Sequence, residues 1–310
     1  MIDRLMRKGR EMLHRQATRD VLATPPIMPT GDPVLVFSMI GTRVLLPYLV
    51  AVKSFHARLG VGRVVILDDG TLTPADRSVL ARHLANPVIL PIKAVETGAC
   101  PRGGCWERLL ALLDLTADNY VVQLDSDTVT VGEVPEVVEA VTANRSFTLL
   151  GDALAEERGI LSLVDFMAAY HPGGSGIDLA GPVHVQGSIE GHWDRYPEPA
   201  RHRYVRGCAG FAGFARGGGP SRASAEAFSR NAESIVGQHK WRRWGSEQVA
   251  SNFLVANSDN PVLLPYARYS NHWNEPPGPD SRFVHFVGTH RYSNGEYRHH
   301  TERAINALSN

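Results

Sequence analysis

Short apolar runs alternate with helical patterns through the first half of the chain. Four runs have the length and composition of strands: VLVFSMI (34–40), RVVILDDG (63–70), PVILPI (87–92) and YVVQL (120–124). Helical patterns separate them at 45–59, 73–84 and 106–114. Strands joined through helices in this way pair in parallel. The pattern predicts an α/β fold, with an open, mostly parallel sheet and helices on both of its faces.

The strand YVVQL runs directly into two aspartates. In an extended chain Asp125 and Asp127 project from the same face, while Ser126 points elsewhere. Adjacent carboxylates repel each other unless a positive charge lies between them. Ligands of open α/β sheets gather at the carboxyl ends of strands, where this pair lies. The pair therefore indicates a cation site, with an ordinary polar turn as the alternative.

Composition and charge narrow the class of protein. The 310 residues are 43% hydrophobic and 21% charged, as in an ordinary globular protein with a substantial core. Lysine and arginine number 32, as do aspartate and glutamate, so no broad basic field favours nucleic acid. The odd number of cysteines, Cys100, Cys105 and Cys208, argues against a disulfide framework. Without a membrane-spanning run or a signal-peptide core, we expect a cytoplasmic protein.

Residues 1–20 form a basic amphipathic segment. Two interpretations are open: a helix packed on the domain, or a helix lying on an anionic membrane surface. Closely spaced prolines in TPPIMPTGDP (24–33) end this helix. We expect an N-terminal helix and linker at 1–30 and a single domain at 31–310.

Two classes of enzyme fit the aspartate pair, and both use a divalent cation. In a nucleotide-sugar transferase, a DxD motif holds the metal on the diphosphate. Asp125-Ser126-Asp127-Thr128-Val129 also resembles the DxDx[TV] motif of haloacid-dehalogenase-like phosphatases, in which Asp125 would be the nucleophile and Asp127 the acid/base. A phosphatase also needs a downstream cation and a further acidic pair. Lys240 is the one lysine after the motif, and no clear GDxxxD follows it.

Further segments resemble the retaining GT-A glycosyltransferases, the group that includes glycogenin and the lipopolysaccharide galactosyltransferases. FVHFVGTHR (283–291) resembles their HFxGxxK signature, with His285, Gly288 and Arg291 at its His, Gly and Lys positions. WGSEQVASNF (244–253) resembles DQxxxN, with Glu247 and Gln248 in register. ILDDGTLTPADR (66–77) resembles LDxGIS, and WERLLALLD (106–114) resembles the arginine-bearing helix that precedes the DxD motif.

The resemblance implies a Rossmann-like GT-A domain, with a nucleotide-binding half at 31–130 and an acceptor half at 131–310. It implies a metal-dependent transfer of sugar, with retention, from a nucleotide-diphosphate sugar of the UDP type to a saccharide or other glycan acceptor. The metal ligands would be Asp125, Asp127 and His285. Hard carboxylates suit Mg²⁺ or Mn²⁺, and the imidazole favours Mn²⁺. Glu247 and Gln248 are the catalytic candidates, with Glu247 placed nearest the anomeric carbon as nucleophile or electrostatic stabiliser.

The resemblance also implies a set of donor-binding residues. Arg108 and Arg291 are expected to grip the diphosphate, because guanidinium groups match phosphate oxygens. Asp152, just after the predicted strand SFTLL (146–150), is expected to hold sugar hydroxyls. The remaining candidates, at two strand ends and in the C-terminal signature, are Gly41, Thr42, Arg43, Asp68, Asp69 and Gly288. For the two aspartates, a simple strand-end turn is the alternative.

Departures from the family pattern leave a third interpretation open. Tyr292 and Ser293 replace a Pro and a Trp, Glu247 replaces an Asp, and Cys208 replaces an Asn. A non-catalytic nucleotide-sugar-binding protein is therefore the alternative to an enzyme. Residues 171–206 are rich in glycine and proline, and their aromatic residues Trp193, Tyr196 and Tyr204 favour a lid or acceptor wall.

Overall fold

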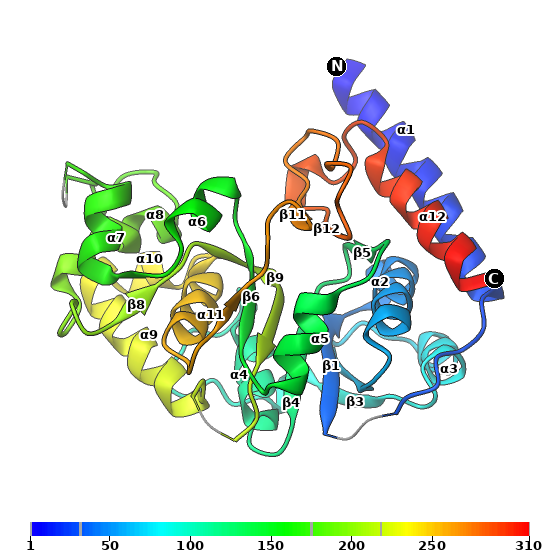
Figure 1. Ribbon diagram of the computed structural model, residues 1–310, viewed down its shortest axis with the longest axis horizontal. Coiled ribbons are helices and arrows are strands. Elements are labelled where there is room, and N and C mark those ends of the chain that lie inside the picture. Colours follow the sequence, from blue (N-terminus) through cyan, green and yellow to red (C-terminus); the bar gives the residue numbers. More distant parts are fainter. Residues whose placement is uncertain (1, 31–32, 174–175, 218, 310) are drawn as a thin grey trace.

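The computed structural model, which describes residues 2–30, 33–173, 176–217 and 219–309, is built on a seven-stranded sheet (Figure 1). The strand order is β10-β6-β9-β4-β1-β2-β3. Its strands are β1 (Val34–Ile40), β2 (Arg63–Asp68), β3 (Val88–Pro91), β4 (Tyr120–Leu124), β6 (Phe147–Leu150), β9 (Gly207–Phe214) and β10 (Val262–Leu263). β9 pairs antiparallel with β4 and β6, and the other pairs are parallel. The mostly parallel sheet is thus confirmed.

Alternate residues of β1 enter two separate cores. Val36 and Ile40 face α2 (Leu45–Leu59), α5 (Pro135–Thr142) and α12 (Glu296–Ser309). Leu35 and Phe37 face the opposite core, which holds side chains of α4 (Trp106–Leu115), α9 (Arg222–Val236) and α11 (Ser246–Ala256). This period-two alternation is what a strand buried on both faces produces. Helices therefore cover both faces, as predicted.

A small second sheet carries the C-terminal segment to the end of β4. It consists of β11 (Tyr269–Asn271), β12 (Phe283–His285) and β5 (Thr128–Thr130). β12 pairs antiparallel with β5, placing His285 opposite Thr128, and β11 places Asn271 opposite His285. Because β5 begins one residue after Asp127, this register brings His285 to the aspartate pair.

Residues 171–206 differ from the expectation, apart from 174–175, which lie outside the described residues. Trp193, Tyr196 and Tyr204 are buried in the core beneath α9 and α11, so these three side chains do not line a lid or acceptor wall; a role of the segment itself in acceptor binding stays a prediction. Their local elements are α8 (Val185–Glu190), η4 (Trp193–Arg195) and β8 (Arg203–Tyr204). These three buried aromatic side chains hold the glycine- and proline-rich segment against the domain.

The other elements are short or peripheral. α3 (Pro74–His83) begins with a capping box at Thr73, at the predicted helix start. The remaining elements are α1 (Ile2–Ala17), η1 (Thr18–Ala23), η2 (Thr42–Val44), η3 (Ile92–Ala94), α6 (Ala153–Arg158), β7 (Leu161–Ser162), α7 (Leu163–Tyr170), α10 (Gln238–Trp241) and η5 (Gly288–His290).

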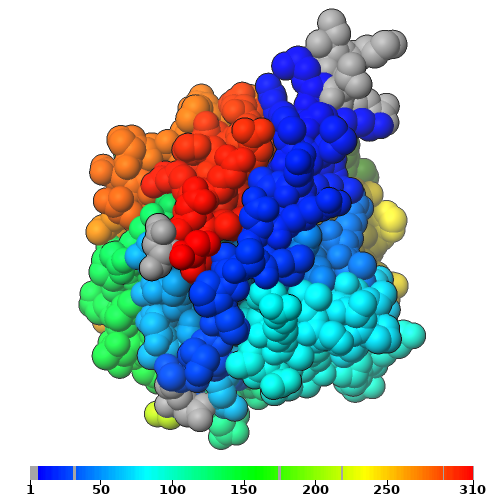
Figure 2. Space-filling model, turned by 90° about the vertical axis from the view of Figure 1, so that its right-hand side faces the viewer, coloured from blue at the N-terminus to red at the C-terminus, as the bar shows by residue number. Residues whose placement is uncertain are grey.

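The first and last helices lie side by side (Figures 1 and 2). The ring of His14 on α1 stacks on Tyr297 of α12, with centroids 3.7 Å apart. His14 Nε2 also lies 3.2 Å from Thr301 Oγ1. Away from this contact α1 exposes Met6, Met12 and Leu13, and its contact with a membrane stays a prediction. Within the described residues, no helix has the length and apolarity that crossing a bilayer requires.

Candidate functional site

The described residues contain one cluster of side chains arranged to hold a metal ion: Asp125, Asp127 and His285, whose ligand atoms lie within 4.8 Å of one another. The aspartates come from the turn between β4 and β5, and the histidine ends β12. His285 Nε2 lies 3.3 Å from Asp127 Oδ1, while its Nδ1 lies 3.0 Å from Asn271 Oδ1. A partner on the second ring nitrogen orients a metal-binding imidazole. This donor set fits a hard divalent cation.

Charge balance in the cluster also favours a bound cation. Burial alone would lower the pKa of His285, but the neighbouring Cys208 and Asp127 raise it well above its ordinary value. Burial would raise the pKa of Asp127, yet His285 and Arg291 hold it at about 2. Burial and the charge of Asp127 raise the pKa of Asp125, against the opposing effect of Arg108. A metal ion bound here would supply the positive charge between the carboxylates in place of the His285 proton.

Arg108 joins this cluster to Glu247. Its Nη1 donates to Asp125, and its Nη2 lies 3.2 Å from both carboxylate oxygens of Glu247. The arginine comes from α4 and the glutamate from the first turn of α11. Burial raises the pKa of Glu247 to about 7 in spite of Arg108. A buried carboxyl group that titrates near neutral pH is typical of catalytic sites.

A cavity of about 620 Å³ opens over these residues. It brings Asp152, Gly288 and Arg291 together with the cluster, Arg108, Glu247 and Gln248. Asp152 also caps α6 by accepting from the Ala155 amide at 2.8 Å. Gln248 accepts from the Ala209 amide at 3.3 Å and donates to Gln186 at 3.1 Å.

Sequence reasoning named the segment 171–206 as a lid or acceptor wall without singling out Gln186 or Arg206, and it missed Trp244 and Trp273; all four residues line this cavity. Arg206 pairs with the buried Glu190 behind the cavity wall. No motif marks these four residues, so only the fold shows that they face the site.

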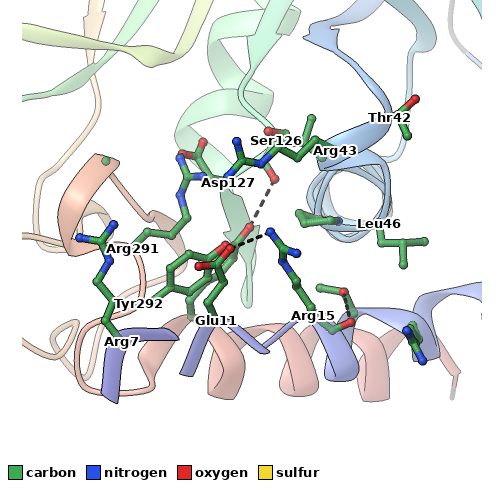
Figure 3. A pocket seen from close by; sticks show the side chains of 16 residues that line it. Arg7, Glu11, Arg15, Thr42, Arg43, Leu46, Ser126, Asp127, Arg291 and Tyr292 are labelled. Carbon is green, nitrogen blue, oxygen red and sulfur yellow. Dashed lines mark hydrogen bonds and ion pairs between the residues drawn. The ribbon is translucent and has the colours of Figure 1, made fainter. Parts of the chain in front are cut away.

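A second cavity, of about 610 Å³, adjoins the first (Figure 3). The two share Asp127, Gly288 and Arg291. Thr42 and Arg43 line the second cavity beyond the end of β1. Arg291 donates to Asp127 and, through Nε, to the Phe286 carbonyl oxygen at 3.1 Å. The metal cluster thus lies where two cavities meet.

The strand-end residues have clear local roles. Asp68 accepts from the Gly70 amide at 2.8 Å and pairs with Arg77, and Asp69 accepts from the Thr71 amide at 2.9 Å. A side chain at Gly41 would lie 2.2 Å from the carboxylate oxygens of Asp69. These contacts build the turn that the alternative interpretation proposed. Asp68 and Asp69 are not among the residues lining either cavity, and donor binding by them stays a prediction.

The parallel sheet, with antiparallel β9 and an acidic pair after β4, is the fold of the GT-A glycosyltransferases. An active-site mutant of LgtC matches the structure with a TM-score of 0.53 at 12% identity, over 89% of this chain and 96% of that chain. The fold implied by the sequence resemblance is thereby confirmed. No protein-family model matches the sequence, and no curated protein matches it significantly.

Two further solved structures are similar. The galactosyltransferase LgtC with donor and acceptor sugar analogs gives a TM-score of 0.47 at 12% identity, over 89% of this chain and 96% of that chain. The bifunctional glycosyltransferase WbbM gives 0.49 at 15% identity, over 92% of this chain and 53% of that chain. The chain thus spans about half the length of WbbM.

Proposed function

We propose that the protein is a metal-dependent glycosyltransferase that uses a nucleotide-diphosphate sugar. The observation that carries this proposal is the convergence of Asp125, Asp127 and His285 at the junction of two cavities. A divalent cation held there would neutralise the charge that develops on the leaving diphosphate. The imidazole ligand favours Mn²⁺ over Mg²⁺.

The two cavities bind different parts of the substrates. The nucleotide occupies the cavity lined by Thr42 and Arg43, in keeping with the resemblance of that turn to a nucleoside-binding loop. The transferred sugar and the acceptor occupy the cavity lined by Glu247 and Gln248. Arg291 borders both cavities and is placed to bind the diphosphate between them. UDP as the nucleotide rests on the family resemblance.

Two exposed tryptophans support a saccharide acceptor. Trp244 is 71% exposed and Trp273 is 51% exposed, and both line the cavity that holds Glu247. Every other Trp, Phe and Tyr side chain in the described part of the chain is buried or half-buried. Exposed aromatic rings beside a cavity mark a ligand site, and the apolar faces of sugar rings stack on them.

Glu247 is placed to act on the reacting sugar. It lies in the sugar cavity, and Arg108 connects it to the Asp125 end of the metal cluster. An ionised Glu247 stabilises a positive charge that develops at the anomeric carbon, or attacks that carbon as a nucleophile. Retention of configuration rests on the resemblance of the HFVG and EQVASN segments to retaining enzymes.

The phosphatase alternative is less well supported. It assigns no function to His285, which lies against Asp127. It also requires Asp125 to attack a phosphate, whereas the buried guanidinium of Arg108 occupies one of its oxygens.

A donor screen tests the proposal. The protein is incubated with UDP- and GDP-sugars and a panel of saccharide acceptors, with Mn²⁺, Mg²⁺ or EDTA. We expect nucleotide release that needs both metal and acceptor, with an α-linked product in NMR spectra of the first-formed species. Hydrolysis of simple phosphomonoesters instead would favour the phosphatase. Nucleotide-sugar binding without turnover would favour the non-catalytic protein.

A further inference from the structure

The N-terminal helix forms one wall of the cavity assigned to the nucleotide. Arg7, Glu11 and Arg15 of α1, with Thr18 and Arg19 of η1, line it. Across the cavity lie Arg43 and the Ser126–Asp127 turn. Figure 3 shows Arg15 and Glu11 pointing from α1 towards that turn. A segment that sequence analysis assigned to a separate terminal helix therefore borders the candidate metal site.

Charge is concentrated in this cavity. Five arginines line it against two carboxylates, Glu11 and Asp127, in a chain whose formal net charge is zero. Glu11 pairs with Arg15 at 2.7 Å, and Asp127 pairs with Arg291. Within the described part of the chain, the other three arginines, Arg7, Arg19 and Arg43, have no ion-pair partner. Unpaired guanidinium groups around one cavity favour an anionic, phosphate-bearing ligand.

The seating of α1 turns Arg7 and Arg15, both solvent-exposed, towards this cavity. Residues 7, 11, 15 and 18 share one side of a helix, because they are spaced three or four residues apart. His14 fixes this rotation through its stack on Tyr297. Tyr297 in turn lies with its hydroxyl 3.4 Å from the Ser126 carbonyl oxygen. The helix is thus held, through one tyrosine, against the turn that carries the metal-binding aspartates.

We infer that α1 and η1 are part of the nucleotide-binding site, and that Arg15 and Arg19 bind the phosphate-bearing part of the donor nucleotide opposite Arg43. This inference rests on the proposed function. The cavity volume, about 610 Å³, lies within the range of small-molecule sites. The alternative, in which α1 lies on a membrane, would turn its exposed apolar residues Met12 and Leu13 towards the lipid, and the vesicle experiment below tests it.

Calorimetric titration with UDP and with GDP, each with Mn²⁺, tests the inference on the protein of residues 1–310. Arg15→Ala and Arg19→Ala are each expected to weaken binding about tenfold, the effect of losing one charged hydrogen bond. Glu11→Gln removes a competing carboxylate and is expected to strengthen binding about threefold. Lys8→Ala removes an exposed charge from the same helix but outside the cavity lining, and should leave affinity unchanged.

The opposite signs separate ligand binding from support of the fold. If Arg15 and Glu11 only hold α1 in place, both variants weaken binding together, and the inference is wrong. Equal affinity of the Arg15→Ala and Arg19→Ala variants and the parent overturns the inference but leaves the proposed function intact. A parent that binds neither nucleotide overturns both. Loss of binding to vesicles of anionic phospholipid, with nucleotide affinity unchanged, would assign the arginines to a membrane instead.

Discussion

Arg108 Nη2 lies 3.2 Å from each carboxylate oxygen of Glu247, and the same guanidinium group donates to Asp125. One buried arginine therefore neutralises charge in two parts of the site. The two carboxylates that Arg108 contacts lie far from it in the sequence. Removing Arg108 therefore affects both the stability of the fold and the chemistry of the site.

Arg108→Ala should lower the free energy of unfolding by about 3–5 kcal/mol, because it leaves two carboxylates without their buried cation. Urea unfolding measures this loss. Arg222→Ala is the matched control, since Arg222 pairs with Asp114 at the surface and its loss should change stability by less than about 1 kcal/mol. Equal losses in the two variants would show that the buried pairing contributes nothing special.

Glu247→Gln should lower kcat by about 100-fold or more while leaving nucleotide affinity unchanged, because the charge acts mainly in the transition state. With a pKa of about 7, Glu247 is ionised above neutral pH and protonated below it. The activity of the parent should therefore rise through pH 7. Steady-state rates between pH 5 and 9 test this point, and a rise that persists in the Gln variant rules out Glu247 as its source.

His285→Ala and Asp127→Ala should each abolish manganese-dependent UDP binding in calorimetry. Both side chains are polar and lie at strand ends, so the circular dichroism spectrum should not change. His299→Ala, at an exposed position of α12, is the control. The three-residue cluster is falsified if the His285→Ala protein binds UDP and manganese like the parent.

Trp244→Ala and Trp273→Ala should raise the KM for a saccharide acceptor about tenfold, because each removes an exposed stacking surface. The KM for the donor should stay at the parent value. Val138→Ala, an exposed apolar position on α5, is the control. A changed donor KM with an unchanged acceptor KM would move the tryptophans to the donor side.

His14 makes α1 sensitive to acid. Burial, with the charges of Arg291 and Arg15, lowers its pKa to about 3, so folding requires the neutral ring. A group whose pKa is lower in the folded state contributes full stability above its unfolded pKa of about 6.5 and loses it as the pH falls towards 3. The loss should reach about 2 kcal/mol at pH 5. Thermal unfolding of the parent and of His14→Phe, which keeps a stacking ring, should differ in this pH range alone.

Local patterns predicted the sheet and the metal cluster better than the walls of the cavities. The strand at 120–124 and the helix at 106–115 follow from periodicity, which depends on neighbouring residues. His285 was identified through its motif, and the pairing of β12 with β5 brings it to Asp127. The stack of His14 on Tyr297 has no local pattern, since it depends on the packing of two distant helices. The position of the exposed Trp244 beside the cavity likewise depends on the fold and has no local sequence pattern.

The contact between α1 and α12 also sets the order in which the cavity is completed. His14 and Thr301, which touch in the folded protein, are 287 residues apart in the sequence. During synthesis α1 emerges from the ribosome long before its packing partner. A nascent chain that ends before residue 288 lacks both Arg291 and Tyr297, so it cannot assemble the cavity next to Asp127. The first helix therefore reaches its binding position only after α12 has been synthesised.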